Sequence, residues 1–156
     1  MDKGKGYLRD AKNSDVDMLF DWANEASVRK NSFSTKPISY EEHVEWFQQL
    51  SKSSDCKQYI YMYEDEAIGQ ARISIYGDMA EIGYSICAEK RCKGHGSILL
   101  KLIRRQIRSD FPEIKKLIGK VKPDNIASQK AFLDAGYIEK YYMFELSIED
   151  AKHIKL

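Results

Sequence analysis

The stretch that decides the fold runs from residue 81 to residue 103 and reads EIGYSICAEKRCKGHGSILLKLI. It has the order of a strand, a short basic turn with two glycines, and an amphipathic helix. The helix has an apolar stripe and an opposite basic face, formed by Leu99, Leu102, Ile103 and Ile107 against Lys101, Arg104, Arg105 and Arg108. This order brings backbone N–H groups and positive charge to the start of a helix, an arrangement suited to binding phosphate.

The glycine turn has the form Arg91-x-x-Gly94-x-Gly96-Ser97. Glycine allows the backbone to approach a ligand closely, while Arg91 and Lys93 add positive charge. The turn lacks the Gly-Lys-Ser/Thr end of a Walker loop, and Leu99 occupies the place of the third glycine of the dinucleotide fingerprint. Taken alone, the turn has two possible explanations: its glycines serve to bind a ligand, or they only allow the backbone to turn from strand to helix.

The composition is that of one globular domain over residues 1–156, with 43% hydrophobic and 31% charged residues. A net charge of +1 argues against a broad nucleic-acid surface. The three cysteines, Cys56, Cys87 and Cys92, lack zinc-like spacing and fit a reducing compartment, so we expect no metal. Because the start lacks a signal core and no apolar run approaches the ~18 residues of a membrane span, we expect a cytoplasmic protein with no membrane partner.

Before the glycine turn, the patterns predict two helices and four strands. After a short strand over residues 6–10, caps at Asn13 and Ser14 start a helix of about three turns, whose end and a short turn occupy residues 22–33. A Ser-x-x-Glu capping box at Ser39 starts a second helix to about Leu50, followed by a polar loop. Tight turns then join strands over residues 59–63, 67–76 and 79–87 into an antiparallel meander.

Downstream, the helix stops before Pro112 and a strand over residues 116–122 follows. An intervening helix favours a parallel arrangement of this strand with the one before the turn. Asn125 can cap a further helix that Gly136 closes in a left-handed conformation. Residues 137–146 are rich in aromatic side chains and are expected to form the last long strand, with a loosely held tail behind them.

Two motifs in register carry a family resemblance. The strand and glycine turn are followed, after a helix and a strand, by Asn125-x-x-Ser128-x-x-x-Phe132-x-x-x-Gly136-Tyr137. This combination resembles the GNAT superfamily of acyl-CoA N-acyltransferases over roughly residues 6–146. The resemblance implies a mixed α/β fold, in which a mostly antiparallel sheet has a parallel pair splayed at the cofactor site and helices on both faces. It also implies acetyl-CoA as the cofactor.

The resemblance assigns the coenzyme A contacts residue by residue. The backbone of Ile86, Cys87 and Ala88 would pair with the pantetheine arm, as another strand would. The pyrophosphate would lie in the turn formed by Arg91, Cys92, Lys93, Gly94, His95, Gly96 and Ser97. Asn125 and Ser128 would reach the pantetheine or nucleotide side, although Asn125 could instead serve only as a helix cap. We expect the His95 side chain, between the glycines, to point to solvent.

The chemistry needs a neutral amine, a polarised thioester carbonyl and a proton for the leaving thiolate. Glu81 is the candidate base, since in a regular strand it shares one face with the small residues Gly83 and Ser85. The alternative is that Glu81 lies at a solvated strand start. Many relatives carry a tyrosine acid where this chain has Leu133. Tyr137, Tyr141, Tyr142 or ordered water stay open as its replacement.

In the resembling family, the first two helices and the central strands form the acceptor site. That region offers Trp22, Arg29, Asn31, His43, Trp46 and Arg72. Aromatic rings beside arginine suit a sugar, a nucleotide phosphate or a peptide terminus, whereas a lone histidine such as His43 can also be structural.

The acceptor itself is suggested by a second likeness. The runs over residues 19–33 and 38–47 are similar to acetyltransferase domains of bacterial amino-sugar nucleotide pathways and, less fully, to ribosomal-protein N-terminal acetyltransferases. We therefore expect a small-molecule amine acceptor, namely a nucleotide-linked amino sugar. A peptide N-terminus and a non-catalytic acyl-CoA sensor are the alternatives, and a homodimer stays open.

Overall fold

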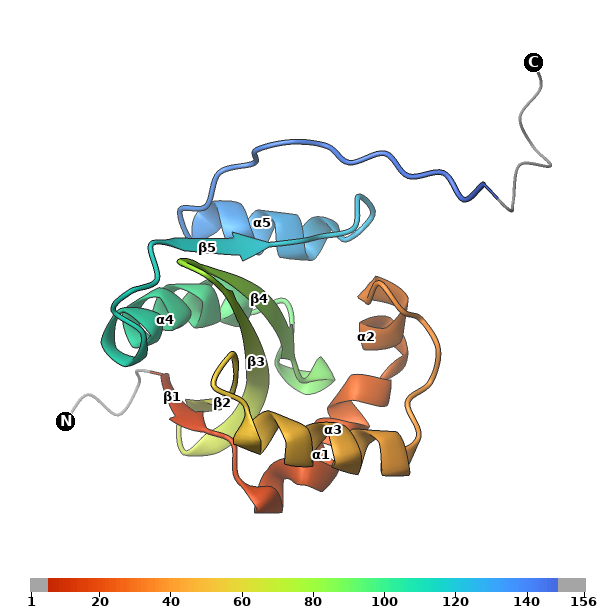
Figure 1. Cartoon of the computed structure of the whole chain (residues 1–156), viewed down its shortest axis with the longest axis vertical. Coiled ribbons are helices and arrows are strands. Elements are labelled where there is room, and N and C mark those ends of the chain that lie inside the picture. The colour runs from red at the N-terminus through yellow and green to blue at the C-terminus, as the bar shows by residue number, and fades with distance from the viewer. Residues whose placement is uncertain (1–5, 149–156) are drawn as a thin grey trace.

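The computed structural model describes residues 6–148 and is built on one sheet (Figure 1). The five strands lie in chain order, β1-β2-β3-β4-β5. The first four pair antiparallel, and the last pairs parallel with its neighbour. Their bounds are β1 Tyr7–Asp10, β2 Cys56–Tyr63, β3 Glu66–Tyr76, β4 Met79–Ile86 and β5 Lys116–Gly119. The expected mixed sheet, with its parallel pair around an intervening helix, is confirmed.

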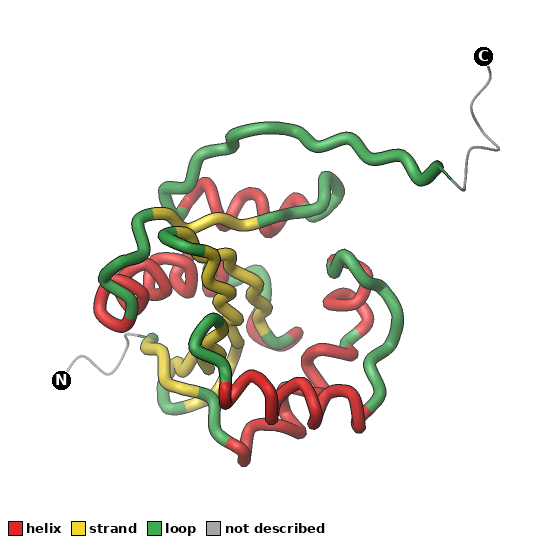
Figure 2. Tube along the Cα trace, viewed as in Figure 1, coloured by secondary structure: helices red, strands yellow, loops and turns green. Residues whose placement is uncertain are grey.

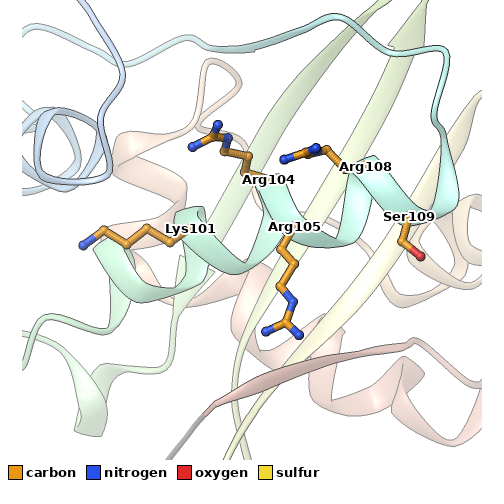
Figure 3. Close-up of a pocket in the computed structure, with 5 residues that line it drawn as sticks. All are labelled: Lys101, Arg104, Arg105, Arg108 and Ser109. Carbon is orange, nitrogen blue, oxygen red and sulfur yellow. The ribbon is translucent and has the colours of Figure 1, made fainter.

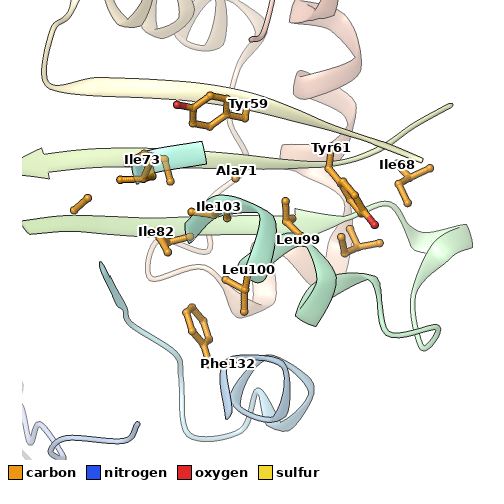
Figure 4. Packing of buried hydrophobic residues seen from close by; sticks show 13 residues of the cluster. Tyr59, Tyr61, Ile68, Ala71, Ile73, Ile82, Leu99, Leu100, Ile103 and Phe132 are labelled. Atoms are coloured by element: carbon orange, nitrogen blue, oxygen red, sulfur yellow. The ribbon is translucent and has the colours of Figure 1, made fainter. Parts of the chain in front are cut away.

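Helices cover both faces of the sheet (Figure 2). On one face, α1 (Val16–Asn24) and α3 (Tyr40–Lys52) bury Leu19 and Phe47 against Ile60 and Met62 of β2. On the other face lie α4 (His95–Asp110) and α5 (Ile126–Asp134). Figure 4 shows that second core, which is composed of side chains from β2, β3, β4, α4 and α5, including Tyr59, Tyr61, Ile73, Ile82, Leu99, Ile103 and Phe132.

The expected caps of α3 and α5 form as the sequence indicates, whereas Asn13 and Ser14 lie within a 3₁₀ helix (Asn13–Asp15) and Asp15 occupies the N-cap of α1. Ser39 Oγ accepts a hydrogen bond from the Glu42 N–H, and the Glu42 carboxylate accepts one from the Ser39 N–H, which starts α3. Asn125 Oδ1 accepts a hydrogen bond from the Ser128 N–H at 3.2 Å, which starts α5. Gly136, with φ of 92°, closes that helix in the left-handed region. No helix within residues 6–148 has the length and apolar character needed to cross a membrane.

Besides the strand expected over residues 116–122, which ends already at Gly119, three sequence expectations differ from the structure. Residues 26–31, expected as the end of a helix and a turn, form a separate helix α2 (Ala26–Asn31). Glu25 adopts an extended conformation, with ψ of 137°, and its side chain accepts a hydrogen bond from the Ser27 N–H, so α1 ends and α2 begins there. Residues 56 and 57, expected in a loop, belong to β2 because they pair with β3.

The third difference is the expected last strand over residues 137–146, which is wrong for this structure. Through residue 148 the chain has no strand after α5 and instead extends outward from the end of that helix (Figure 1). A strand needs a hydrogen-bonded neighbour, and no described strand lies beside this segment. The expected tail lies outside the described residues, apart from Ile148.

Candidate active site

The sheet splits between β4 and β5. β5 pairs with β4 only from Met79 to Ile82, while β4 continues to Ile86. The Cys87 N–H donates to the Ile68 carbonyl on the β3 side. Since backbone groups alternate in direction along a strand, those of Tyr84 and Ile86 face the opposite edge, beyond the end of β5. The split therefore presents a length of strand backbone without a β5 partner.

The glycine turn starts α4 at this split. Cys92 and Gly94 adopt left-handed conformations, with φ of 60° and 81°, and fold the chain back so that α4 begins at His95. The Ile98 N–H donates to the Gly94 carbonyl, whereas the N–H groups of the preceding residues in the first turn lack intrahelical acceptors. Free N–H groups at the positive end of a helix attract anions, so the turn has the geometry of a phosphate site.

The Arg91 side chain is engaged with α2. Nε donates to the Ile86 carbonyl at 2.9 Å, and the guanidinium also donates to Ser27 Oγ and to Glu25 Oε2, the latter at 2.6 Å. The hydrogen bond from Arg91, with a further one from Ser27, lowers the pKa of Glu25 to about 2. Arg91 thus connects the glycine turn to α2, and its contact with pyrophosphate stays a prediction.

Glu81 lies on the strand face expected for it, together with Gly83 and Ser85. Its Oε2 is 3.2 Å from Nζ of Lys120, just beyond β5, and 27% of its side chain remains exposed. The carboxylate is therefore held near the split and is accessible to solvent. Its role as a base stays a prediction.

A row of polar side chains crosses the same sheet face, and sequence reasoning missed it. Gln58 Nε2 donates to Gln70 Oε1 at 2.7 Å, and Gln70 Nε2 donates to Ser85 Oγ at 3.1 Å. The row runs from β2 across β3 to β4. Its signal in the sequence is a glutamine within each of two strands otherwise rich in apolar residues, which is unusual for a face packed only on a core.

Three of the candidate acceptor residues lie together beside this row. Arg72, which pairs with Gly83 in register, places its guanidinium 6.0 Å from the centre of the Trp46 ring. Burial lowers the pKa of Arg29, and the charge of Arg72 lowers it further, so the two guanidinium groups are neighbours. Arg29 also donates to the carbonyls of Ala23, Ser34 and Lys36, which fixes the chain around α2.

The other three candidates lie in the helix layer. His43 is buried with Nε2 2.9 Å from the Val16 carbonyl, which ties α3 to α1. Trp22 packs against the cluster of Leu19 and Phe47, and Asn31 ends α2. Contact of these three residues with an acceptor stays a prediction.

Comparison with known families identifies the chain. Residues 7–138 match the family described as "Acetyltransferase (GNAT) domain". The protein belongs to the GNAT acetyltransferase family. As a GNAT protein it is an N-acetyltransferase, which agrees with the split sheet and the glycine turn. No curated protein sequence matches the chain.

Solved structures share the GNAT fold at low sequence identity. The aminoglycoside acetyltransferase AAC(6')-Ib, in complex with coenzyme A and kanamycin, has a TM-score of 0.75 and 20% identity over 87% of this chain and 86% of that chain. Spermidine N-acetyltransferase from Vibrio cholerae, with coenzyme A and spermine, has a TM-score of 0.79 and 16% identity over 89% and 84% of the two chains. RimL, a ribosomal alpha-N-protein acetyltransferase, in complex with coenzyme A, has a TM-score of 0.72 and 22% identity over 85% and 79%.

The tyrosines that could replace the acid missing at Leu133 lie in different environments. Leu133 is exposed, as are Tyr141 and Tyr142 on the segment after α5. The Tyr137 ring packs on Phe132, and its hydroxyl is buried without a hydrogen-bond partner among the described residues. Burial raises the pKa of Tyr137 to about 12. The core position of this hydroxyl argues against a role in proton transfer.

Tyr84 is a tyrosine that sequence reasoning missed. Its hydroxyl lies 3.1 Å from Ser128 Oγ in the first turn of α5, and a Cβ at Gly96 would be only 3.4 Å from it. Burial raises the pKa of Tyr84, and the hydrogen bond with Ser128 opposes this shift. The sequence does contain a signal for this residue. Tyr84 lies in β4 one residue from Gly83, so its side chain is on the opposite face of the sheet from Gly83. Tyr84 lies where the split, α4 and α5 meet.

His95 corrects an expectation, because it is buried and does not point to solvent. Its Nδ1 is 3.1 Å from the Tyr61 hydroxyl, and its ring lies edge-on to Tyr63 at 4.7 Å between centres. Burial, aided by the charges of Lys90 and Lys93, lowers the pKa of His95. The reason is helical spacing: residues 95, 99 and 103 follow one another at intervals of one turn on the side of α4 that packs on the sheet.

The basic residues of α4 line a shallow pocket on its outer face (Figure 3). The side chains project away from the helix axis and belong to Lys101, Arg104, Arg105, Arg108 and Ser109. This arrangement confirms the two faces expected for the helix. The pocket begins more than one turn beyond Gly96, so it is distinct from the glycine turn at the helix start.

Proposed function

We propose that the protein acetylates a primary amine on a nucleotide-linked amino sugar, by direct attack of the amine on the thioester of acetyl-CoA. The observation that carries the proposal is the pairing of Arg72 with Gly83 on the sheet face that also holds Glu81. A phosphate-binding guanidinium and a base therefore lie on one polar surface next to the split.

The cofactor would enter the split between β4 and β5. The backbone groups of Tyr84 and the Ile86 N–H on the open edge can pair with the amides of pantetheine, while the Ile86 carbonyl accepts a hydrogen bond from Arg91 Nε. The free N–H groups at the start of α4 can bind the pyrophosphate, with Lys93 as an exposed cation nearby. Asn125 caps α5 and Ser128 bonds to Tyr84, so both are at the helix start that borders the split.

The reaction needs one proton acceptor and one proton donor from the protein. Glu81 would take a proton from the ammonium or from the attacking amine, as its nitrogen bonds to the acetyl carbon. The carbon–sulfur bond then breaks, and the thiolate takes a proton. We assign this proton to the Tyr84 hydroxyl, which can be positioned by Ser128. An N–H on the open β4 edge can polarise the acetyl carbonyl.

The acceptor surface favours a polyhydroxylated, phosphorylated amine. Gln58, Gln70 and Ser85 offer amide and hydroxyl groups for sugar hydroxyls, and Trp46 offers an aromatic face beside Arg72. The similarity to an enzyme crystallised with kanamycin supports an amino-sugar acceptor. The similarity to RimL keeps a peptide N-terminus as the competing acceptor.

The experiment is a thiol-release assay on the full chain with acetyl-CoA and a panel of amines. The panel pairs a nucleotide-linked amino sugar with the same sugar lacking the nucleotide, and adds an aminoglycoside, spermidine and a peptide N-terminus. We expect the highest kcat/KM for the nucleotide-linked sugar, with a loss of about 10-fold or more without its phosphates. If only the peptide were acetylated, the acceptor would be a peptide N-terminus and not a nucleotide-linked amino sugar. Thermal stabilisation by acetyl-CoA without turnover of any amine would favour a sensor instead.

A further inference from the structure

The outer face of α4 carries four exposed cations, called the basic stripe below: Lys101, Arg104, Arg105 and Arg108. Figure 3 shows Arg104 and Arg108 one after the other on one side of the helix, with Arg105 projecting on the other side. The four positions span two turns, which is about 10 Å along a helix axis. The stripe is therefore a compact positive surface.

The basic stripe has no acidic partner in the described part of the chain. Within residues 6–148, no carboxylate oxygen lies within 4 Å of its four cationic groups. Asp110 is the only acidic residue of α4, and its carboxylate accepts hydrogen bonds from the Tyr59 hydroxyl at 2.6 Å and from Gln106 Nε2. The positive charge of the stripe is therefore directed to solvent.

The four cations of the stripe also repel one another. Residues 101 and 108 each lie three and four positions from residues 104 and 105, and side chains at these intervals are neighbours on a helix surface. Like charges at such intervals destabilise a helix. A polyanion bound across the stripe would offset this repulsion in addition to attracting each cation.

The basic stripe is separate from the candidate active site. It lines a shallow pocket of about 520 Å³, which begins more than one turn after Gly96. The opposite side of α4, with Leu99, Ile103 and Ile107, packs on the sheet. A partner bound to the stripe would therefore leave the split between β4 and β5 open.

Two classes of polyanion fit the stripe poorly. Nucleic-acid surfaces combine many phosphate contacts with stacking aromatic rings or a strongly positive charge. The stripe has only four cations, no described aromatic side chain lines its pocket, and the net charge of the chain is +1. A helix that lies on a membrane inserts its apolar face into the lipid, whereas the apolar face of α4 is buried in the core.

An acidic helix fits the stripe better. Two helices have the same rise and the same number of residues per turn, so acidic side chains at positions i, i+3, i+4 and i+7 of one helix can meet the four cations of the other. Three of these cations are arginines, whose planar guanidinium groups bind carboxylates through two parallel hydrogen bonds. Charge and spacing are thus both complementary.

We propose that the basic stripe docks an acidic α-helix of a partner protein, with aspartate or glutamate side chains on one face of that helix against Lys101, Arg104, Arg105 and Arg108. The contact is electrostatic and exposed, so it weakens as salt is added. This inference does not depend on the proposed acceptor or on the proposed cofactor contacts.

The first test uses a fluorescently labelled helical peptide with glutamates at i, i+3, i+4 and i+7. Its control peptide has the same composition, with the glutamates distributed around the helix. Fluorescence anisotropy with the full chain measures both dissociation constants. We expect the one-face peptide to bind about 10-fold more tightly than its control, and its affinity to fall about 10-fold between about 50 and about 300 mM salt.

The second test reverses charge within the stripe. Arg104→Glu with Arg105→Glu should weaken binding of the one-face peptide by about 100-fold, because attraction becomes repulsion at two of four contacts. The same change turns the repulsive pairs within the stripe into attractive ones, so the variant should melt no lower than the wild type. Lys52→Glu with Lys130→Glu is the matched control, since it changes the net charge equally at two other exposed helix positions. It should weaken binding by about 2-fold or less.

Three outcomes would overturn the proposal. Equal affinity for the two peptides would mean that the stripe responds to charge alone and not to a helix face. Tighter binding of a single-stranded oligonucleotide, or of phosphatidylglycerol vesicles, would assign the stripe to a nucleic acid or to a lipid surface. An equal loss of affinity in the two double variants would ascribe peptide binding to the net charge of the chain.

Discussion

Arg91 Nη2 lies 2.6 Å from Oε2 of Glu25, although the two residues are 66 positions apart in the chain. Glu25 starts α2 in the layer assigned to the acceptor, and Arg91 lies in the turn assigned to coenzyme A. One ion pair therefore connects the two halves of the candidate active site.

We expect Glu25→Gln to destabilise the protein at neutral pH, by about 1 kcal/mol or less because the pair is partly exposed. The pKa of this carboxyl is about 2 in the folded protein and ordinarily 4.5. The stabilisation is therefore complete above 4.5 and is lost as the pH falls toward 2. Urea unfolding across this range should show the variant and the wild type converging at low pH. Glu113→Gln, an exposed control, should show no such convergence, and a pH-independent deficit in Glu25→Gln would contradict the role of the ion pair.

We expect Glu81→Gln to lower kcat by about 100-fold at low pH, where the amine is protonated and needs a base. The deficit should shrink at high pH, where the amine loses its proton unaided, and the affinity for acetyl-CoA should hardly change. A pH–rate profile with acetyl-CoA titration measures both quantities. Glu66→Gln is the control, because Glu66 is also a strand glutamate paired with a lysine, namely Lys90 at 2.6 Å. Parallel pH profiles for wild type and Glu81→Gln would leave Glu81 a structural residue.

We expect Tyr84→Phe to lower kcat by about 10-fold or more with a small change in KM, because the donor for the leaving thiolate is lost. Ser128→Ala should have a weaker effect of the same kind, since it removes only the partner of the hydroxyl. An acyl donor with a more acidic leaving thiol should restore kcat of Tyr84→Phe toward the wild-type value, because its thiolate can leave without being protonated. If the rate with that donor falls as much as with acetyl-CoA, the tyrosine acts through packing alone.

We expect Arg72→Gln to raise the KM of a phosphorylated acceptor by about 10-fold, with the dissociation constant of acetyl-CoA unchanged. The size of the effect follows from the loss of a charge-assisted hydrogen bond. Initial rates over a range of acceptor concentrations, with isothermal titration of acetyl-CoA, separate the two sites. Arg105→Gln, on the outer face of α4, should match the wild type, and an equal rise in the two variants would point to a general effect of charge.

We expect Gly119→Ala to destabilise the fold by about 1–3 kcal/mol through overpacking. A Cβ at Gly119 would collide with the ring of Phe132, which packs under the end of β5. Gly83→Ala is the matched strand control, because the nearest atom to its Cβ would be Arg72 Nη2 at 4.0 Å. Chemical denaturation measures the two variants. Equal stability of the two variants would mean that β5 shifts to make room.

Local patterns in the sequence were sufficient to predict most of the fold. The Ser39 and Asn125 caps, the meander and the parallel pair follow from spacing over a few residues, and the structure confirms them. The glycine turn and its helix were recognisable for the same reason. The predicted coenzyme A contacts depend on those elements and stay a prediction.

Long-range side-chain contacts decided what the sequence could not predict. The charge of Arg91 next to the glycines predicts a phosphate contact, but the sequence does not show that its side chain also binds Glu25 at the start of α2. His95 was placed in solvent because it lies between two glycines, yet the helical spacing directs it to Tyr61. The aromatic-rich segment after Tyr137 is typical of a strand in its composition, but composition does not supply the hydrogen-bonded neighbour that a strand needs, and no described strand pairs with it.

The strands lie in the sheet in the same order as in the chain, and this order has a consequence for folding during synthesis. β3 and β4 can each add to a neighbour already synthesised, since short turns join β2, β3 and β4, whereas the helices α1 to α3 separate β1 from β2. The β4–β5 joint is different, because all of α4 must be in place before these parallel strands meet. The split next to that joint is thus among the last parts of the sheet to form. Nascent chains that stop before β5 should contain much of the sheet and still be unable to retain coenzyme A, so cofactor capture reports completion of the domain.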